Sequence, residues 1–333
     1  MPIPPLVQQV RATLRAAILA GRLRHDQIPR EVILTLPPPD ADAPPAPRQA
    51  SAAPGPTANA PVPPRRLRLM TYNTHGCVGL DGACRPERIA AVIARFAPDV
   101  VALQEVDVGL WRSGSLDQAR RIADLTGLSP HFTSARNTGG GHYGNAILTH
   151  HPYELRAEGI LPVRGGEVRA AQWLRLSFDD GYLDVVNTHL SLHFLERIAQ
   201  FRALFSDEPH SPIGTHPAPF PPLRGEHLGR LVLCGDFNAG ALSPLYFLLR
   251  RRLRDAQRAR GRRAEPTFPS RYPVLRIDHV WLGAGLQAES VLVPRDALAR
   301  IASDHLPIVV DLSLTPLSSG SRAPSGEHRG MTP

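Results

Sequence analysis

The sequence predicts an α/β fold in which two packed β-sheets are flanked by helices. Between Arg65 and Leu314, short apolar segments typical of strands alternate with segments of helical periodicity. The strand-like segments outnumber the helical ones, and together they fill one stretch of about 250 residues, enough for one large domain. Many strands and few helices in such a stretch are typical of two sheets packed against each other.

Eight segments have the composition of strands, because they are short, apolar and rich in Val, Ile, Leu and aromatic residues. They are RLRLMTY (66–72), DVVALQ (99–104), NAILT (145–149), QWLRLSF (172–178), YLDVVNTHL (182–190), LVLCGDF (231–237), IDHVWL (277–282) and IVVDLSL (308–314). Together they supply the two sheets.

Helical periodicity predicts three helices, over 86–97, 115–126 and 191–205. Pro86 at the first position and four apolar side chains on one face support the first of them. A fourth helix should begin at Ser243 and Pro244, because a capping serine followed by a first-turn proline is typical of a helix start.

The termini differ in composition from this central domain. Residues 1–36 contain a basic amphipathic segment, which we expect to be a helical or weakly structured extension. Residues 37–64 hold eleven prolines and few large apolar groups, so we expect a disordered Pro/Ala-rich linker. The catalytic domain is expected over 65–314, and residues 315–333 form a Ser/Gly/Pro tail expected to be disordered.

The bulk composition narrows the class of protein. Hydrophobic residues make up 42% and charged residues 20%, as in soluble globular proteins. No apolar run approaches the roughly 18–20 residues that a membrane span requires, and the N-terminus lacks a secretory pattern. Three cysteines cannot form a disulfide framework and suit a reducing compartment. We therefore expect a cytoplasmic protein.

The positive charge is concentrated in one run. Residues 250–263 contain eight arginines and one acidic residue, which accounts for nearly all of the net charge of +8. Such a run is a candidate for contacts with nucleic-acid phosphates. It is equally typical of the solvated face of a surface helix.

Polar side chains stand where the predicted strands begin or end. The clearest case is LVLCGDFNAG, where a buried-strand pattern runs directly into Gly235, Asp236 and Asn238. Asp and Asn often cap turns, so one such case needs no functional explanation. The same pattern recurs, however, at Asn73, His75, Glu105, His189, Asp278, Asp304 and His305. A shared site for a metal or a phosphate explains so many metal- or phosphate-competent groups better than separate turns do.

These motifs resemble those of a known family. TYNTHG, ALQEVD, YGNAIL, NTHL, GDFN, IDHV and SDHLP occur in this order in the endonuclease/exonuclease/phosphatase family, and the resemblance covers about residues 67–313. It implies a four-layered α/β sandwich with the active site between the edges of two mixed sheets. It also implies divalent-metal-dependent hydrolysis of a phosphoester.

The resemblance assigns a metal-binding role to three of the residues. Glu105 corresponds to the metal ligand, Asn73 beside it would contribute an amide oxygen, and Asp304 would reach the metal or assist orientation. Hard oxygen ligands without a thiolate suit Mg²⁺ or Mn²⁺.

Five further residues are expected to carry the chemistry. The resemblance makes His305 the general base for the attacking water, held through its other ring nitrogen by Asp278. Asp236 and Asn238 would position the nucleophile and a phosphoryl oxygen. His189 would stabilise the developing charge or protonate the leaving oxygen.

The chain also departs from relatives in the family. His75 stands where exonuclease-III-like members have Asp, so we expect it to contact substrate rather than metal. Tyr143 and Asn145 are candidates for lining the site, although a tight turn at Gly144 explains that segment equally well.

These features predict a divalent-metal-dependent phosphodiesterase of the endonuclease type. An alternative is a lipid or small-molecule phosphodiesterase or phosphatase, and a catalytically silent scaffold is an alternative of another class. The expected partners are a phosphoester substrate, with nucleic acid bound through 250–263 or a phospholipid head group as alternatives, and we expect a monomer.

Overall fold

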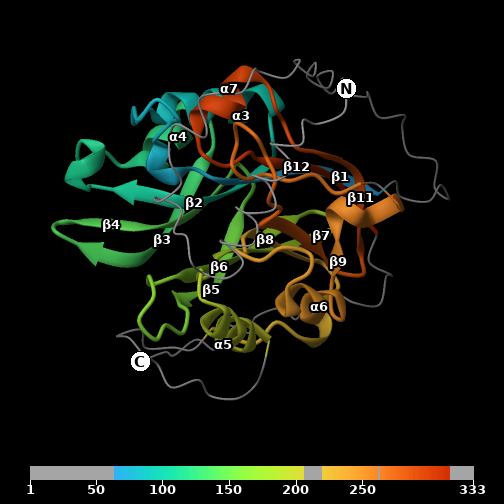
Figure 1. Cartoon of the computed structure of the whole chain (residues 1–333). Helices are drawn as coiled ribbons and strands as arrows, with labels where there is room; N and C mark the ends of the chain where they lie inside the picture. Colours follow the sequence, from blue (N-terminus) through green and yellow to red (C-terminus); the bar gives the residue numbers. More distant parts are fainter. Residues whose placement is uncertain (1–63, 206–219, 262, 316–333) are drawn as a thin grey trace, which may run out of the picture.

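The computed structural model describes residues 64–205, 220–261 and 263–315. The predicted extension (1–36) and nearly all of the linker (37–64) and of the tail (315–333) lie outside the described residues, so the domain boundaries stay predictions. The regular elements run from Arg65 to Leu314 and form two six-stranded sheets with helices on their outer faces (Figure 1).

The first sheet combines strands from both ends of the domain. Its order is β11 (Leu286–Leu292), β12 (Ile308–Leu314), β1 (Arg65–Asn73), β2 (Val100–Val108), β4 (Gly141–Thr149) and β3 (Ser129–Thr138). Strands β1 and β2 are parallel, and the other neighbours are antiparallel.

The second sheet is built from the middle of the chain. Its order is β5 (Tyr153–Ile160), β6 (Ala170–Phe178), β7 (Gly181–His189), β8 (Leu231–Asp236), β10 (Asp278–Leu282) and β9 (Arg254–Asp255). Here β7 and β8 are the parallel pair.

The helices cover the two outer faces, which completes four layers. Helices α3 (Pro86–Phe96), α4 (Gln118–Thr126) and α7 (Ala297–Ala302) pack against the first sheet, and α5 (Phe194–Phe205) and α6 (Pro244–Arg250) pack against the second. Within the described residues, four short 3₁₀ turns lie in the connections: η2 (His75–Cys77), η3 (Trp111–Ser113), η4 (Gly225–Leu228) and η5 (Ala256–Gly261). The predicted four-layered α/β sandwich is confirmed.

The main core lies between the two sheets. Leu69 and Val310 of the first sheet and Val185, Val232 and Val280 of the second belong to one buried cluster. Two further clusters lie between each sheet and its helices. Each Å² of apolar surface buried on folding contributes about 25 cal/mol, so this packing is the main stabilising contribution. Because the side chains between the sheets are closely packed, the sheets are held in one relative position.

The strand directions bring the polar strand ends to one edge. Asn73 pairs with Gln104, His189 pairs with Asp236, and Asp278 pairs with Asp236. The carboxyl ends of β1, β2, β7 and β8 and the start of β10 therefore share one edge of the sandwich. No helix among the described residues is long and apolar enough to cross a membrane.

The sequence interpretation missed several elements. All eight predicted strands are present, but β3, β5, β9, β11 and α7 were not predicted. The edge strand β5 is largely exposed, so it lacks an apolar pattern, and α7 is only six residues long. The interpretation of 250–263 as a surface helix is wrong, because α6 ends at Arg250 and the chain then forms β9 and η5.

Candidate active site

A bulge in β2 directs Glu105 into the site. The pairing of β2 with β4 shifts in register between Leu103 and Val106, and Glu105 has a φ of 57°. This left-handed conformation is unfavourable for a residue with a side chain and is typical of functional positions. Thr74 supports it, because its hydroxyl donates to the Glu105 carbonyl over 2.9 Å. The bulge thus re-aims one carboxylate at the edge of the strand.

The turn after β8 is built around a glycine. Gly235 has a φ of 133°, and a Cβ at this position would lie 1.9 Å from the carbonyl oxygen of Thr188 on β7. Asp236, fully buried, then accepts a hydrogen bond from the backbone N–H of Asn238 over 2.9 Å. Asn238 has a φ of 47°, which asparagine tolerates better than most residues. The Gly-Asp-Phe-Asn sequence therefore fixes two polar side chains at a strand end.

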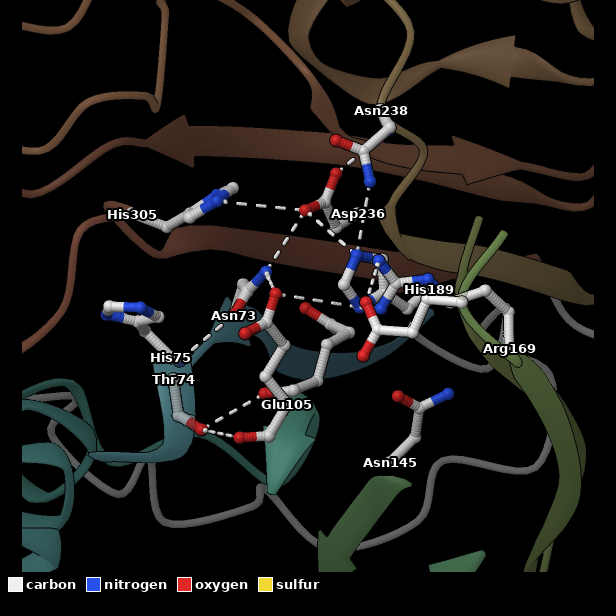
Figure 2. A network of polar contacts seen from close by, with 12 residues as sticks. Asn73, Thr74, His75, Glu105, Asn145, Arg169, His189, Asp236, Asn238 and His305 are labelled. Carbon is white, nitrogen blue, oxygen red and sulfur yellow. Dashed lines mark hydrogen bonds and ion pairs between the residues drawn. The ribbon is translucent and has the colours of Figure 1, made fainter. Parts of the chain in front are cut away.

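Asn73 joins the acidic groups of the two sheets. Its amide nitrogen donates to Oε1 of Glu105 and to Oδ2 of Asp236, each over 3.0 Å (Figure 2). Its amide oxygen accepts the backbone N–H of His75 over 3.0 Å, which sets the orientation of the amide. Two carboxylates from different sheets are thereby held on one buried side chain.

His305 faces the same carboxylate from the other side. Its Nδ1 lies 2.9 Å from Oδ2 of Asp278, and its Nε2 lies 3.7 Å from Oδ2 of Asp236. A carboxylate only accepts, so Nδ1 carries the proton in that contact and Nε2 points to Asp236. Burial lowers the pKa of His305, but Asp278 and the other nearby carboxylates outweigh it and raise this pKa to about 10. Thr267 also donates to Asp278.

His189 lies between an arginine and the acidic groups. Its Nδ1 is 2.9 Å from Nη1 of Arg169, and its Nε2 is 3.4 Å from Oδ2 of Asp236 and 3.1 Å from the amide nitrogen of Asn238. A guanidinium and an amide NH2 group can only donate, so Arg169 and Asn238 approach the two ring nitrogens as donors, and Asp236 is the acceptor beside Nε2. Arg169 and Asn238 therefore hold the imidazole of His189 from both of its nitrogens.

A cleft of about 460 Å³ opens over this network. Glu105 and Arg169 belong both to the network and to the walls of the cleft, and Tyr143, His75 and Asp304 also line it. The Tyr143 hydroxyl accepts from Arg169 over 3.3 Å, and burial raises the pKa of Tyr143 well above its usual range. His75 and Asp304 approach to 3.8 Å. A small polar group in the cleft would therefore reach Glu105 and Arg169.

The donor atoms fit a hard divalent cation. Ligand atoms of Glu105, His189 and Asp236 lie within 4.8 Å of one another, as do those of Asp236, Asp278 and His305. These two sets of carboxylate oxygens and imidazoles could hold a divalent metal ion. Several carboxylates converging in a buried site also need a compensating cation, because their mutual repulsion is unfavourable.

The structure brings together most of the residues that the sequence singled out. Asn73, Glu105, His189, Asp236, Asn238, Asp278 and His305 form one network, and His75, Tyr143 and Asp304 line the cleft above it. Asn145 is buried beside them, and its amide donates across the sandwich to the carbonyl of Ala170 over 2.9 Å. The roles of these residues remain predictions.

Arg169 was missed. It precedes β6, which runs antiparallel to β7, so the start of β6 lies beside the end of β7 and next to His189. Most of the site residues predicted from the sequence are polar groups that follow an apolar run. An arginine directly before the run AAQWL was the available signal, since the beginning of an antiparallel strand shares an edge with the end of its neighbour.

Comparison with known proteins agrees with the fold and the motifs. The model of the endonuclease/exonuclease/phosphatase family matches residues 70–305, and the chain belongs to this family. YbhP, an uncharacterized protein of Escherichia coli strain K12, is 28% identical over 264 residues, which cover 74% of this chain and 96% of YbhP.

Two solved structures illustrate the similarity in fold. An endonuclease/exonuclease/phosphatase from Beutenbergia cavernae has a TM-score of 0.56 and 24% identity, covering 75% of this chain and 72% of that one. The catalytic domain of human nocturnin has a TM-score of 0.52 and 22% identity, covering 76% and 94%.

Proposed function

We propose that this protein is a divalent-metal-dependent phosphoester hydrolase of the phosphodiesterase type. The observation that carries the proposal is the convergence of Glu105, Asp236 and the Asp278–His305 pair at one edge of the sandwich. Oxygen ligands for a cation stand there beside an oriented imidazole, and hydrolysis of a phosphoester by water requires both.

Glu105 and Asp236 would hold the cation, with Asp304 and the amide oxygen of Asn73 as further ligands. The amide nitrogen of Asn73 faces Glu105 and Asp236, so its oxygen would reach a cation there only after the amide rotates. Bound Mg²⁺ or Mn²⁺ would neutralise charge on the phosphate and so favour attack at phosphorus.

His305 would take the proton from the attacking water. Asp278 holds its Nδ1–H, so Nε2, which faces Asp236, is the nitrogen that would accept the proton. The pKa of about 10 means that the imidazole is charged when only carboxylates surround it. A divalent cation at Glu105 and Asp236 opposes this effect and favours the neutral imidazole that a general base needs.

His189, Asn238 and Asp236 would act on the phosphate and its leaving group. With its ring proton on Nε2, the nitrogen beside Asp236, His189 would donate to a phosphoryl oxygen or to the leaving oxygen. Asn238 offers amide hydrogens next to it. Asp236 would align the water between the two histidines, which lie 3.4 and 3.7 Å from its Oδ2.

The test is an assay of the full chain after EDTA treatment. Bis(para-nitrophenyl) phosphate and para-nitrophenyl phosphate would be offered with Mg²⁺, Mn²⁺ or Ca²⁺, so that diester and monoester hydrolysis are separated. We expect metal-dependent diester hydrolysis that His305→Ala reduces by several orders of magnitude, about 10²–10⁴ or more. Hydrolysis that survives both EDTA and His305→Ala would contradict the proposal.

A nuclease is the second candidate, because part of the arginine run carries uncompensated charge. The described arginines at 250, 251, 252, 254 and 258 form no ion pair with a described carboxylate. The one acid of the run, Asp255, is buried and bound by Arg276 over 2.5 and 2.6 Å. Arg254 donates to the backbone carbonyls of Gly283, Ala284 and Leu286, but exposed arginines without an ion pair, such as Arg250 and Arg251, favour binding of a phosphate backbone.

The position of this run argues against a direct role at the cleft. Arg254 pairs with Leu282, at the end of β10 opposite to Asp278, about 13 Å along the strand. Arg250→Glu combined with Arg251→Glu, both exposed, separates the candidates. A nuclease should lose plasmid cleavage relative to cleavage of the small diester, and its salt dependence should weaken. An unchanged ratio would remove nucleic acid as a ligand of this run.

A further inference from the structure

Three side chains that can bind metal cluster outside the candidate active site. Asp99, His150 and His151 each offer one ligand atom, and these atoms lie within 4.8 Å of one another. None of the three lines the cleft over the catalytic network. Asp99 immediately precedes β2, and Glu105 lies near the other end of that strand, so the two carboxylates are on the order of 20 Å apart. The cluster is therefore separate from the candidate active site.

Strand pairing brings the three residues together. The start of β2 pairs with the end of β4 in an antiparallel register, which places Asp99 next to His150. The buried hydroxyl of Thr149 donates to the carbonyl of Asp99 over 2.9 Å and accepts the backbone N–H of His151 over 3.1 Å. The Asp99 carboxylate also accepts the backbone N–H of Arg68 over 2.6 Å. These contacts fix the backbone positions from which the three side chains extend.

His151 has a buried ring nitrogen without a partner. Its Nε2 makes no hydrogen bond with any described residue. The ring packs edge-to-face on Phe178 at a centroid distance of 5.0 Å and lies 4.2 Å from the ring of His150. Buried polar atoms nearly always have a partner, so this nitrogen is unsatisfied in the protein alone. An imidazole protonated at Nδ1 has a lone pair on Nε2, which a bound metal ion would accept.

The donor set favours a transition-metal ion over Mg²⁺. Two of the three ligands are imidazoles, which suit Zn²⁺, Ni²⁺ and Cu²⁺, whereas Mg²⁺ prefers oxygen. Ligand atoms bound to one Zn²⁺ at about 2.0–2.1 Å lie about 3.4 Å apart, so the cluster must close by at most about 1.4 Å. The side chain of His150 is exposed and can make this movement by rotation.

The nearby positive charge is compensated. The guanidinium of Arg65 lies 4.7 Å from the ring of Phe178, which His151 contacts from another direction. Arg65 is paired with Asp180 over 2.6 Å. Its charge therefore opposes a cation at the cluster only weakly.

We propose that Asp99, His150 and His151 form a second metal site, which takes Zn²⁺ or a related divalent transition-metal ion. Three protein ligands leave a fourth position for water, and the exposed His150 makes the site accessible to solvent. The bound ion would stabilise the connection between the two sheets, since His150 and His151 join β4 to β5 and the ring of His151 contacts the end of β6. This site does not depend on the proposed hydrolysis.

Zn²⁺ binding to the full chain tests the site. The chain is treated with EDTA, freed of the chelator and titrated with Zn²⁺ in a calorimeter. We expect His150→Ala to weaken one binding event by about 100-fold or more, because loss of a residue that only supports a metal ligand already costs about 10–100-fold. His193→Ala, at another exposed histidine, is the matched control and should bind as the wild type does. Equal Zn²⁺ binding by these two variants would overturn the proposal.

Glu105→Gln separates this site from the candidate active site. If Zn²⁺ also binds at Glu105, the wild type shows two events, of which Glu105→Gln should lose one and His150→Ala the other. Asp99→Asn keeps an acceptor for the N–H of Arg68 but removes the charge, so it should weaken the event that depends on His150 by about tenfold or more. If Glu105→Gln abolishes all Zn²⁺ binding, the cluster binds no metal and the inference fails.

Thermal unfolding gives a readout that a folding defect does not imitate. At a Zn²⁺ concentration 100 times Kd, Tm of the Glu105→Gln chain should rise by about 5–10 °C, and adding His150→Ala should remove this rise. In EDTA the two chains should unfold at the same temperature, because the His150 side chain is exposed. An equal rise in both chains, or an equal rise with Mg²⁺, would contradict a site formed by these imidazoles.

Discussion

Oδ2 of Asp278 lies 2.9 Å from Nδ1 of His305, although Asp278 begins a strand of the second sheet and His305 precedes a strand of the first. The pair therefore couples the two layers at the edge where the acidic side chains meet. If Asp278 serves to hold one tautomer of His305, then removing either residue should have the same effect as removing both.

Asp278→Asn should lower kcat/KM by about 10²–10⁴, because the amide no longer holds the Nδ1–H tautomer. In His305→Ala, the same change should have almost no further effect, since residues acting as a unit are strongly non-additive. Kinetics of the two single variants and the double variant measure this coupling. Asp180→Asn, at an exposed ion pair with Arg65, is the control. Additive losses would show that Asp278 acts independently of His305.

Metal ions should stabilise the protein through Glu105 and Asp236. At a metal concentration 100 times Kd, binding adds about 2.7 kcal/mol, which raises Tm by about 5–10 °C in a domain of this size. Glu105→Gln should abolish most of this shift in thermal unfolding with Mg²⁺ or Mn²⁺. Glu154→Gln, an exposed glutamate on β5, should leave it intact. An undiminished shift in Glu105→Gln would place the cation elsewhere.

Gly235→Ala should destabilise the fold by about 3 kcal/mol or more, because a Cβ there would lie 1.9 Å from the Thr188 carbonyl and the φ is 133°. Gly240→Ala is the matched control, since its Cβ would be 3.8 Å from the nearest atom. Urea unfolding of both variants gives the comparison. Similar stabilities for the two variants would mean that β7 and β8 can separate at little cost.

His279 should make stability depend on pH. Burial, reinforced by Arg276, lowers its pKa to about 4, and its Nε2–H donates to the Ala239 carbonyl over 2.7 Å. The unfolded chain binds a proton near pH 6.5, so this stability is complete above that pH and is lost as the pH falls towards 4.

His279→Gln removes this titration. The difference in unfolding free energy between the wild type and His279→Gln should shrink by about 2 kcal/mol from pH 7 to pH 5. Urea titrations at the two pH values measure it, with exposed His150→Gln as the control. A constant difference would show that His279 does not titrate in this interval.

Sequence patterns predicted the fold class and most of the strands, because buried strands are apolar and end at turn residues. They did not predict β5, whose exposed edge position removes the apolar signal. The site residues found from sequence share a strand end followed by a polar group, as at Asp236. Arg169 was not predicted, because its place in the site depends on which strand pairs with β7. The local composition of the sequence does not determine which distant segments pair.

The network runs from Asn73 to His305, so it uses both the earliest and the latest strands of the domain. During synthesis, His305 leaves the ribosome after almost all of the domain, and domains generally fold as units. A nascent or truncated chain therefore lacks His305 and its contact with Asp278. Under the proposed roles, such a chain has the acids without the base, so we expect no hydrolysis before the last strand is in place.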